Sequence, residues 1–242
     1  MKDSIEFKMG KLSIHTSQDA LWGHNFLYQY RCYYNRKMSR LNELCELHGS
    51  DKGGNAKNAP YPWPAHSYSD YIERHFGAFR HYVKSVFECG LGSNDPTVQS
   101  NMTKTGRPGA SLRVWRDYFP NAQIYGIDID EKIIFSEDRI QTFHCDQTNI
   151  LQIEELWKRL PGVEFDLMID DGLHTFDAGV SLFESSIRKL RSEGVYIIED
   201  VAPGTLVKFY DYFARSDYSV DFVNLHRPGL ELKDNSLVVI RK

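Results

Sequence analysis

The sequence predicts an α/β fold: a Rossmann-like, mostly parallel sheet of seven strands, with a C-terminal antiparallel hairpin and an N-terminal helical cap or lid. Three observations support this prediction. Short apolar runs bounded by turn residues recur from residue 85 onward, as is typical of strands buried on both faces. Amphipathic segments of helical period separate several of these runs. Acidic residues follow several runs directly, where an open parallel sheet binds its ligands.

The length and composition are those of a globular protein with one sizeable core. The chain has 242 residues, a formal net charge of −4, and 41% apolar and 26% charged residues. We divide it into a cap and lid segment, residues 1–80, and a main domain, residues 81–242. No basic run is present, so no nucleic-acid partner is expected. No signal peptide or apolar run of membrane-spanning length is visible, so no membrane partner is expected.

The cysteines give no sign of a metal or redox site. The four are Cys32, Cys45, Cys89 and Cys145, and no two have C-x-x-C spacing. Free thiols fit a reducing compartment, so a cytoplasmic location is expected.

The segment from residue 1 to about 48 is expected to be helical and partly amphipathic. It contains an aromatic group that consists of Trp22, Phe26, Tyr28, Tyr30, Tyr33 and Tyr34. A helical cap of this kind would pack on the main domain or on another subunit, so a homo-oligomer through the aromatic segment is one expectation. A loop rich in glycine and proline follows. For its residue Lys52, and for His66 and Tyr68 just beyond it, an ordinary polar turn and a functional loop remain equally open.

The first strand of the main domain, residues 85–89, runs into a glycine-rich turn. Gly90 and Gly92 would let the backbone approach a ligand closely. Asp95 holds the place of the third glycine of the dinucleotide fingerprint, which disfavours NAD or FAD. Glu88, on the strand before the turn, could pair with a cationic group of a ligand or anchor a loop by hydrogen bonds.

The next two strands, residues 124–130 and 142–148, also end in acids. Asp128 is placed to accept hydrogen bonds from ribose hydroxyls, and Asp130 is expected to cap the next turn. Asp146 could accept a hydrogen bond from the exocyclic amine of adenine, with Gln147 beside it. In the alternative interpretation, Asp146 only caps the helix of residues 149–160.

Two further strands each end in a pair of acids. Residues 167–169 lead into Asp170 and Asp171, and residues 195–198 lead into Glu199 and Asp200. His174 follows the first pair. If the strands are neighbours, four carboxylates and an imidazole converge, which calls for a metal ion, a cationic ligand or both. In the alternative, Asp171 caps the helix that begins near residue 175 and the second pair is a polar strand end.

The last part of the chain predicts a helix at residues 206–213 and two strands, residues 219–223 and 237–240. The connection between the strands is short enough for the antiparallel hairpin.

Together these motifs resemble the class I S-adenosylmethionine-dependent methyltransferases, over roughly residues 83–242. The resemblance depends on residues 88–92, 126–130 and 146–147 and on the closing hairpin. More narrowly, residues 169–174 with 198–200 resemble the metal-dependent sugar O-methyltransferases of macrolide and aminocoumarin glycoside pathways and of polysaccharide gene clusters. The upstream residues 49–53 and 66–68 resemble the N-terminal lid of that group.

The resemblance implies a set of roles for residues of this chain. Asp171, Glu199 and Asp200 would hold magnesium, and His174 would act as the general base beside the catalytic Asp171. The residues expected to bind S-adenosylmethionine are Glu88, Gly90, Gly92, Asp128, Asp146, Gln147, Asp170, Lys52 and Tyr68. Leu173 stands where relatives usually have a small residue, which leaves the shape of the acceptor pocket open.

The expected reaction is methyl transfer to a sugar hydroxyl, either nucleotide-linked, on a polysaccharide precursor or on a glycosylated natural product. A hydroxyl is a poor nucleophile, so magnesium would lower its pKa and a neutral imidazole near pH 7 would take the proton. Carboxylate ligands without cysteine favour magnesium over zinc. The alternatives are a phenolic or catechol-like acceptor, and a nucleotide-dependent oxidoreductase on the same fold.

Overall fold

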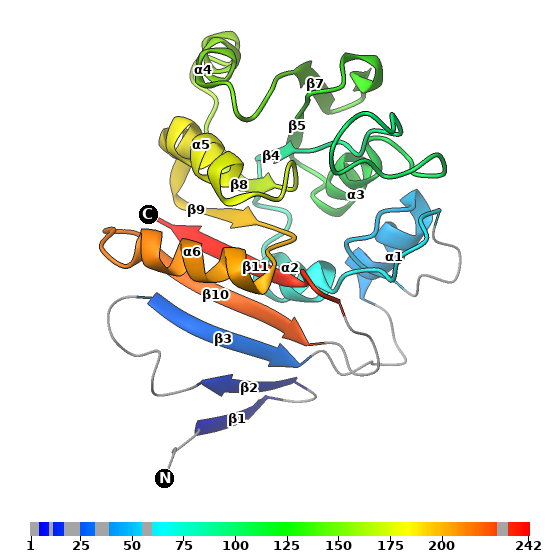
Figure 1. Cartoon of the computed structure of the whole chain (residues 1–242). Coiled ribbons are helices and arrows are strands. Elements are labelled where there is room, and N and C mark those ends of the chain that lie inside the picture. Colours follow the sequence, from blue (N-terminus) through cyan, green and yellow to red (C-terminus); the bar gives the residue numbers. More distant parts are fainter. Residues whose placement is uncertain (1–4, 10–11, 17–24, 32–38, 55–59, 227–231) are drawn as a thin grey trace.

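The computed structural model describes the backbone of residues 5–9, 12–16 and 25–31, and residues 39–54, 60–226 and 232–242 in full. Its strands form one sheet of 11 strands in the order β1-β2-β3-β10-β11-β9-β8-β4-β5-β7-β6 (Figure 1). The strands are β1 Ile5–Met9, β2 Leu12–Thr16, β3 Asn25–Arg31, β4 Ser85–Cys89, β5 Gln123–Asp128, β6 Ser136–Glu137, β7 Ile140–His144, β8 Phe165–Asp170, β9 Leu190–Ile198, β10 Ser219–His226 and β11 Ser236–Arg241. The helices are α1 Arg40–His48, α2 Tyr68–Phe76, α3 Ala110–Tyr118, α4 Ile150–Arg159, α5 Phe176–Ser186 and α6 Pro203–Phe213, with the short helices η2 Glu131–Ile133 and η3 Ile187–Lys189.

The centre of the sheet is parallel, and helices cover both of its faces. Strands β9, β8, β4, β5 and β7 are paired in parallel. Successive strand residues alternate between two apolar cores, so that Leu167 and Ile169 pack with α1, α2 and α3 while Met168 packs with α4, α5 and α6. A parallel sheet buried on both faces explains the continuous apolar runs of the sequence.

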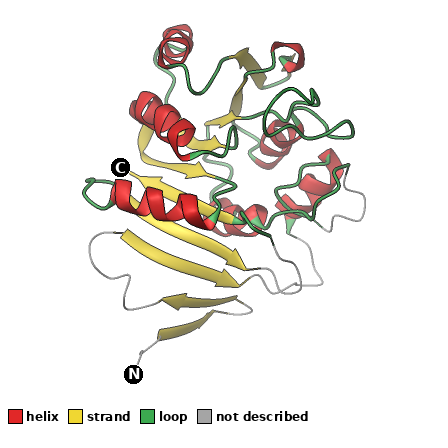
Figure 2. Cartoon of the chain, viewed as in Figure 1, coloured by secondary structure: helices red, strands yellow, loops and turns green. Residues whose placement is uncertain are grey.

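Local sequence signals fix where the helices begin. The side chain of Asn149 accepts hydrogen bonds from the backbone at the start of α4, and Thr175 does the same at the start of α5. Pro203 occupies the first position of α6, where a missing backbone N–H costs nothing. These starts place the loops before α4 and α5 beside the ends of the strands that they follow, as Figure 2 shows for β8.

The predicted fold class is confirmed. All seven predicted strands are present as β4, β5, β7, β8, β9, β10 and β11. The closing hairpin is also present, because β10 and β11 are antiparallel and β11 lies antiparallel to β9. The structure adds the two-residue strand β6 and three strands at the N-terminal end.

The prediction of helix from residue 1 to about 48 is wrong. Residues 5–9, 12–16 and 25–31 are strands, and β3 pairs in parallel with β10, so the helix of this segment begins at Arg40. Phe26, Tyr28 and Tyr30 recur every second residue, which is the period of a strand, and aromatic residues favour strands. The other members of the aromatic group, at positions 22, 33 and 34, lie outside the described residues. The division of the chain after residue 80 remains a prediction.

Two further observations concern the described residues only. Cys45, Cys89 and Cys145 are buried free thiols. Within the described ranges, no helix has the length and apolar character needed to cross a membrane.

Candidate active site

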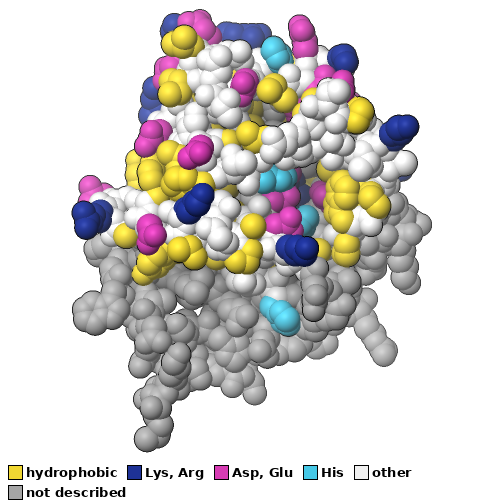
Figure 3. Space-filling view, in the orientation of Figure 1, with side chains coloured by type: hydrophobic (Ala, Val, Ile, Leu, Met, Phe, Trp, Pro, Cys, Tyr) yellow, Lys and Arg dark blue, Asp and Glu magenta, His cyan; other side chains and the backbone are white. Residues whose placement is uncertain are grey.

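A cavity of about 310 Å³ lies at the carboxyl ends of the central strands. The residues that follow β4, β5, β7, β8 and β9 line it, together with residues from the loop between α1 and α2 and from the segment before β11. Figure 3 shows acidic and histidine side chains gathered in the hollow of this face. The strand order places the turns after β4, β5 and β7 at one end of the cavity, the ends of β8 and β9 in the middle, and the segment before β11 at the other end.

The glycine turn after β4 packs directly against the turn after β8. Gly90 has φ +93°, and a Cβ added to it would lie 2.0 Å from the carbonyl oxygen of Asp171. The backbone N–H of Asp171 in turn donates to the carbonyl of Cys89 at 2.9 Å. Gly90 and Gly92 both line the cavity. The glycine at position 90 therefore brings the cofactor turn and the acidic turn together.

Replacing Gly90 by alanine should both destabilise the protein and distort this junction. Gly162→Ala is a matched control, because Gly162 has φ +70° and nothing lies within 4 Å of an added Cβ. The control should lower the free energy of unfolding only by the backbone strain of a left-handed residue, which is about 1–2 kcal/mol. Gly90→Ala should lower the free energy of unfolding, measured by chemical denaturation, by more than the control does. It should also weaken the binding of S-adenosylhomocysteine, measured by calorimetry. Equal losses of stability, with unchanged binding, would contradict the proposed junction.

Asp128 lines the cavity and also holds the glycine turn. Its carboxylate accepts hydrogen bonds from the backbone N–H of Leu91 at 2.7 Å and of Asp130 at 2.8 Å. Burial raises the pKa of Asp128. Asp130 caps η2 through the backbone N–H of Lys132, as predicted. The carboxylate of Asp128 thus stabilises the backbone of the turn at the position where a ligand hydroxyl would bind.

Asp146 and Gln147 line the same end of the cavity. The alternative that Asp146 caps α4 is wrong, because Asn149 provides that cap. The amide nitrogen of Gln147 donates to Asp170 at 3.1 Å, and its oxygen accepts from the backbone N–H of Leu173 at 2.7 Å. Asp170 is therefore buried against Gln147 and does not line the cavity, and burial raises its pKa to about 6.

Asp171, His174 and Asp200 form a group that could hold a metal ion. One ligand atom from each lies within 4.8 Å of the others. Nε2 of His174 is 3.3 Å from Oδ1 of Asp171 and 3.6 Å from Oδ2 of Asp200. The alternative that Asp171 caps α5 is wrong, since Thr175 provides the cap. We call these three residues the triad.

The backbone and the charges of the triad are both unusual. His174 has φ 59° and Asp200 has φ 53°, a left-handed conformation that side chains rarely adopt and that tends to occur at functional sites. Burial works to lower the pKa of His174, but the hydrogen bond to Asp171 and the charge of Asp200 outweigh it and raise the pKa to about 10. Without a further cation, the imidazole is therefore protonated near pH 7.

The four carboxylates lie close together with His174 at the neighbouring ends of β8 and β9, but only two of the four line the cavity. Each acid pair is divided between different partners at the strand ends. Asp171 and Asp200 line the cavity, whereas Asp170 contacts Gln147 and the buried Glu199 forms an ion pair with Lys52. Asp171 and Asp200 of the predicted metal set thus lie together in the triad with His174, and the metal set stays a prediction.

Besides Asp170, three residues predicted to bind the cofactor do not line the cavity. Glu88 accepts a hydrogen bond from the indole N–H of Trp115 at 2.6 Å, and burial raises its pKa to about 7. Lys52 contacts Glu88 at 3.2 Å. The hydroxyl of Tyr68 donates to Asp200 at 2.5 Å. All three lie behind the residues that line the cavity, where they contact its acids or their neighbours.

The structure also brings residues to the cavity that the sequence did not assign. Asp51, Trp63 and Asp234 line it, as does His66, for which a functional role had been left open. Nε2 of His66 lies 3.5 Å from Asp200 and 3.3 Å from Asp234. Burial works to lower the pKa of His66, but Asp200 and Asp234 raise it to about 9. The one local signal for this group is a long loop rich in glycine and proline.

Comparison with known proteins identifies relatives but no family model that matches the chain. The chain is 31% identical over 166 residues to 8-demethyl-8-alpha-L-rhamnosyl tetracenomycin-C 2'-O-methyltransferase from Streptomyces olivaceus, a match that covers 69% of this chain and 39% of that protein. It is 32% identical over 136 residues to mycinamicin VI 2''-O-methyltransferase from Micromonospora griseorubida, which covers 56% of this chain and 32% of that protein. The chain thus spans less than half the length of these curated relatives.

A solved structure shows the same fold. The MycE methyltransferase from the mycinamycin biosynthetic pathway, in complex with Mg, SAH and mycinamycin VI, aligns with a TM-score of 0.58 at 25% identity, over 86% of this chain and 55% of that chain. These relatives are methyltransferases, which gives no support to the alternative of an oxidoreductase. They act on glycosylated natural products, so they give no support to a polysaccharide precursor either. The chain therefore has the class I methyltransferase fold and is a homologue of the sugar O-methyltransferases of macrolide and polyketide glycoside pathways.

Proposed function

We propose that this chain catalyses transfer of the methyl group of S-adenosylmethionine to a hydroxyl of a sugar on a glycosylated small molecule, with a divalent cation bound at the triad. The observation that carries the proposal is a single cavity that joins the glycine turn after β4 to Asp171, His174 and Asp200. A methyltransferase needs both parts in one space, because the methyl donor and the activated hydroxyl must meet in line.

The cofactor end of the cavity fits S-adenosylmethionine. The whole cavity has a volume of about 310 Å³, which is within the range of small-molecule sites. Gly90 and Gly92 bring backbone close to the ligand, and Asp128 and Asp146 supply carboxylates at the ends of β5 and β7. Ribose hydroxyls, an amine and a sulfonium all favour such acceptors and negative charge.

The donor set of the triad fits a hard divalent cation. Two carboxylates and an imidazole, without a cysteine, favour magnesium or manganese over softer ions. Glu199 follows the same strand as Asp200, and its Oε1 is buried without a hydrogen-bond partner. This oxygen is therefore a further possible ligand for a cation at the triad. We therefore retain Asp171 and Asp200 as proposed ligands, with Glu199 as the candidate for a third. The imidazole of His174 then stays beside the cation without binding it and keeps a free nitrogen for the proton of the acceptor. When bound, the cation would polarise the acceptor hydroxyl and lower its pKa.

The residues of the chain perform the remaining steps of the proposed reaction. Tyr68 holds Asp200 through its hydroxyl, so that the carboxylate stays beside His174. The imidazole of His174 takes the proton of the acceptor hydroxyl, and the hydroxyl oxygen forms a bond to the methyl carbon as the bond from carbon to sulfur breaks. The sulfonium leaves as a neutral thioether, so atoms and charges balance. General-base assistance of this kind contributes on the order of 10²–10⁴-fold.

The acceptor end of the cavity suits a sugar ring. Trp63 stacks on Tyr61 with ring centroids 5.4 Å apart, and its indole N–H donates to Asp51 at 2.9 Å. Asp51, Trp63 and Asp234 all line this end. A pyranose presents an apolar face of C–H groups and a rim of hydroxyls, which match an aromatic face and carboxylate acceptors respectively.

Trp63→Ala should therefore raise the KM for a rhamnosylated acceptor by about 2- to 12-fold, since an aromatic contact contributes about 0.5–1.5 kcal/mol. Binding of S-adenosylhomocysteine should be unchanged, because Trp63 lies at the other end of the cavity. Trp63→Phe is the matched control: it keeps an aromatic face and loses only the N–H bonded to Asp51, so its KM should change less. An unchanged KM in Trp63→Ala would place the sugar elsewhere.

The function is tested with the full chain, S-adenosylmethionine and magnesium. Nucleotide sugars, rhamnosylated polyketides and catechols are each incubated with the protein, and mass spectrometry detects the gain of one methyl group. Methylation of a glycosylated product supports the proposal, and methylation of catechol alone would reject the sugar acceptor. A calorimetric titration with S-adenosylhomocysteine and with NAD separates the cofactor classes, and binding of NAD alone would reject the methyltransferase function.

A further inference from the structure

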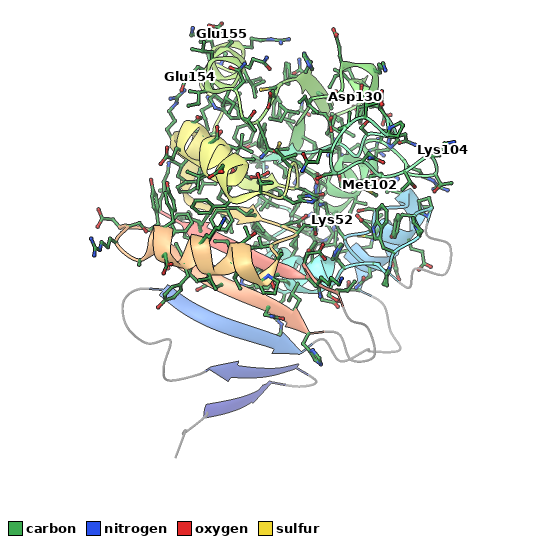
Figure 4. The ribbon with its side chains drawn as sticks, viewed as in Figure 1. Lys52, Met102, Lys104, Asp130, Glu154 and Glu155 are labelled. Carbon is green, nitrogen blue, oxygen red and sulfur yellow. The ribbon has the colours of Figure 1, made fainter. Side chains whose placement is uncertain are left out.

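Lys52 lies outside the cavity but touches three of the acids around it. The residue is 2% exposed, and its Nζ is 2.6 Å from Oδ2 of Asp171 and 3.2 Å from Oε1 of Glu88. It also forms an ion pair with Oε2 of Glu199. These acids stand at or just after the ends of β4, β8 and β9, which are neighbours in the sheet. Figure 4 shows Lys52 near the middle of the molecule.

The backbone that carries Lys52 is itself anchored. The carbonyl of Lys52 accepts a hydrogen bond from the backbone N–H of Ser69 at 2.9 Å. The next residue, Gly53, has no room for a side chain, because an added Cβ would lie 1.8 Å from Oγ of Ser69. The backbone N–H of Gly54 donates to the side chain of Asn42 at 2.6 Å. Helices α1 and α2 thus fix the position from which the ammonium reaches the acids.

The two oxygens of Asp171 face different partners. Oδ2 contacts the ammonium of Lys52, and Oδ1 lies 3.3 Å from Nε2 of His174 in the triad. A carboxylate that is bound at one oxygen by a buried cation keeps one rotamer, because rotation would leave the cation without that partner. The other oxygen is then directed to the cavity.

We propose that Lys52 is a positioning residue, which holds Oδ2 of Asp171 so that Oδ1 is presented to the divalent-cation position of the triad. This inference rests on the proposed function in its use of a cation at the triad. It differs from the cofactor contact predicted for Lys52, since the side chain touches no part of the cavity surface. The loop between α1 and α2 would then have a function, because it carries the residue that orients Asp171 in the main domain.

The test measures binding of Mn²⁺ alone, by the electron paramagnetic resonance signal of the free ion, in the full chain. Lys52→Met keeps the length of the side chain and removes its charge. We expect Mn²⁺ affinity to fall by about 10–100-fold, the usual effect of losing a group that orients a metal ligand. Lys158→Met is the control, because Lys158 is exposed and pairs with Glu155 on the surface of α4. Its affinity should equal that of the wild type.

A second variant separates positioning from simple charge balance. Lys52→Met leaves Glu199 buried without its cation, so the variant is expected to unfold at a lower temperature. Lys52→Met combined with Glu199→Gln removes that buried charge. Glu199→Gln alone is the reference, because Glu199 is itself a candidate ligand. If Lys52 positions Asp171, the double variant regains thermal stability and binds Mn²⁺ more weakly than Glu199→Gln does. Equal Mn²⁺ affinities of the double variant and of Glu199→Gln would overturn the inference.

The outcomes also separate this inference from the proposed function. Wild-type affinity in a folded Lys52→Met variant overturns the positioning role, whatever the acceptor is. A wild-type chain that binds no Mn²⁺ overturns the cation of the proposed function, and the inference with it. Failure to methylate any sugar, with the expected Mn²⁺ results, rejects the proposed acceptor and leaves the role of Lys52 standing.

Discussion

Replacing Asp171 by asparagine is expected to reduce methyl transfer on the order of 10³-fold. Asparagine keeps the shape of the side chain and removes the charge that contacts both His174 and Lys52. A catalytic metal contributes several kcal/mol, and each 1.36 kcal/mol is about a tenfold change in rate. Binding of S-adenosylhomocysteine should change little, because its proposed site is built by the turns after β4, β5 and β7. Single-turnover kinetics and calorimetry measure the two quantities separately.

The control for this variant is Asp177→Asn, an exposed acid in the first turn of α5, which should leave the rate unchanged. Chelation of the wild type should have the same effect as Asp171→Asn, and added magnesium should restore the activity of the wild type alone. If wild-type activity survives exhaustive treatment with EDTA, the cation has no role, and the acids are structural or bind the acceptor directly.

The second large effect is expected for His174→Ala, with a loss of about 10²–10⁴-fold at neutral pH. In the protein without a divalent cation, Asp171 and Asp200 outweigh the effect of burial and raise the pKa of His174 to about 10. A group with a raised pKa is protonated below it, so at pH 7 this imidazole could not accept a proton. A cation at the triad counteracts both carboxylates, so the pKa of His174 should fall when magnesium is added. Titration by NMR of the ring protons, with and without magnesium, measures this shift.

The pH dependence of the rate provides an independent check on the same residue. The wild-type rate should rise as His174 loses its proton, and the rate of His174→Ala should recover partly at high pH as hydroxide replaces the base. His81→Ala, at an exposed position away from the cavity, is the matched control and should keep the wild-type profile. If His174→Ala has the wild-type rate at pH 7, the base is another group of the cavity.

The sequence by itself determined the seven strands of the main domain and the glycines, acids and histidine that form the centre of the cavity. Buried strands, amphipathic helices and turns leave local patterns, and the right-handed connections of a parallel sheet bring the strand ends to one edge. Gly90, Asp128, Asp171 and Asp200 could therefore be assigned to one site before any distance was known, and the structure places them there. The cap of η2 by Asp130 was equally local, because the acceptor and the donor are two residues apart.

Only the tertiary structure decided which acid has which partner. Along the sequence, Lys52 is 119 residues from Asp171 and 147 residues from Glu199, yet it contacts both. Strands β3 and β10 are likewise far apart in the sequence and pair in the sheet. Local propensity carries no information about such pairs, because the free energy of a buried charge or of a strand edge depends on what lies against it after folding. The sequence thus predicted the site as a set of residues. Packing of the loop between α1 and α2 against the sheet divided that set into a triad in the cavity and a lysine-centred cluster behind it.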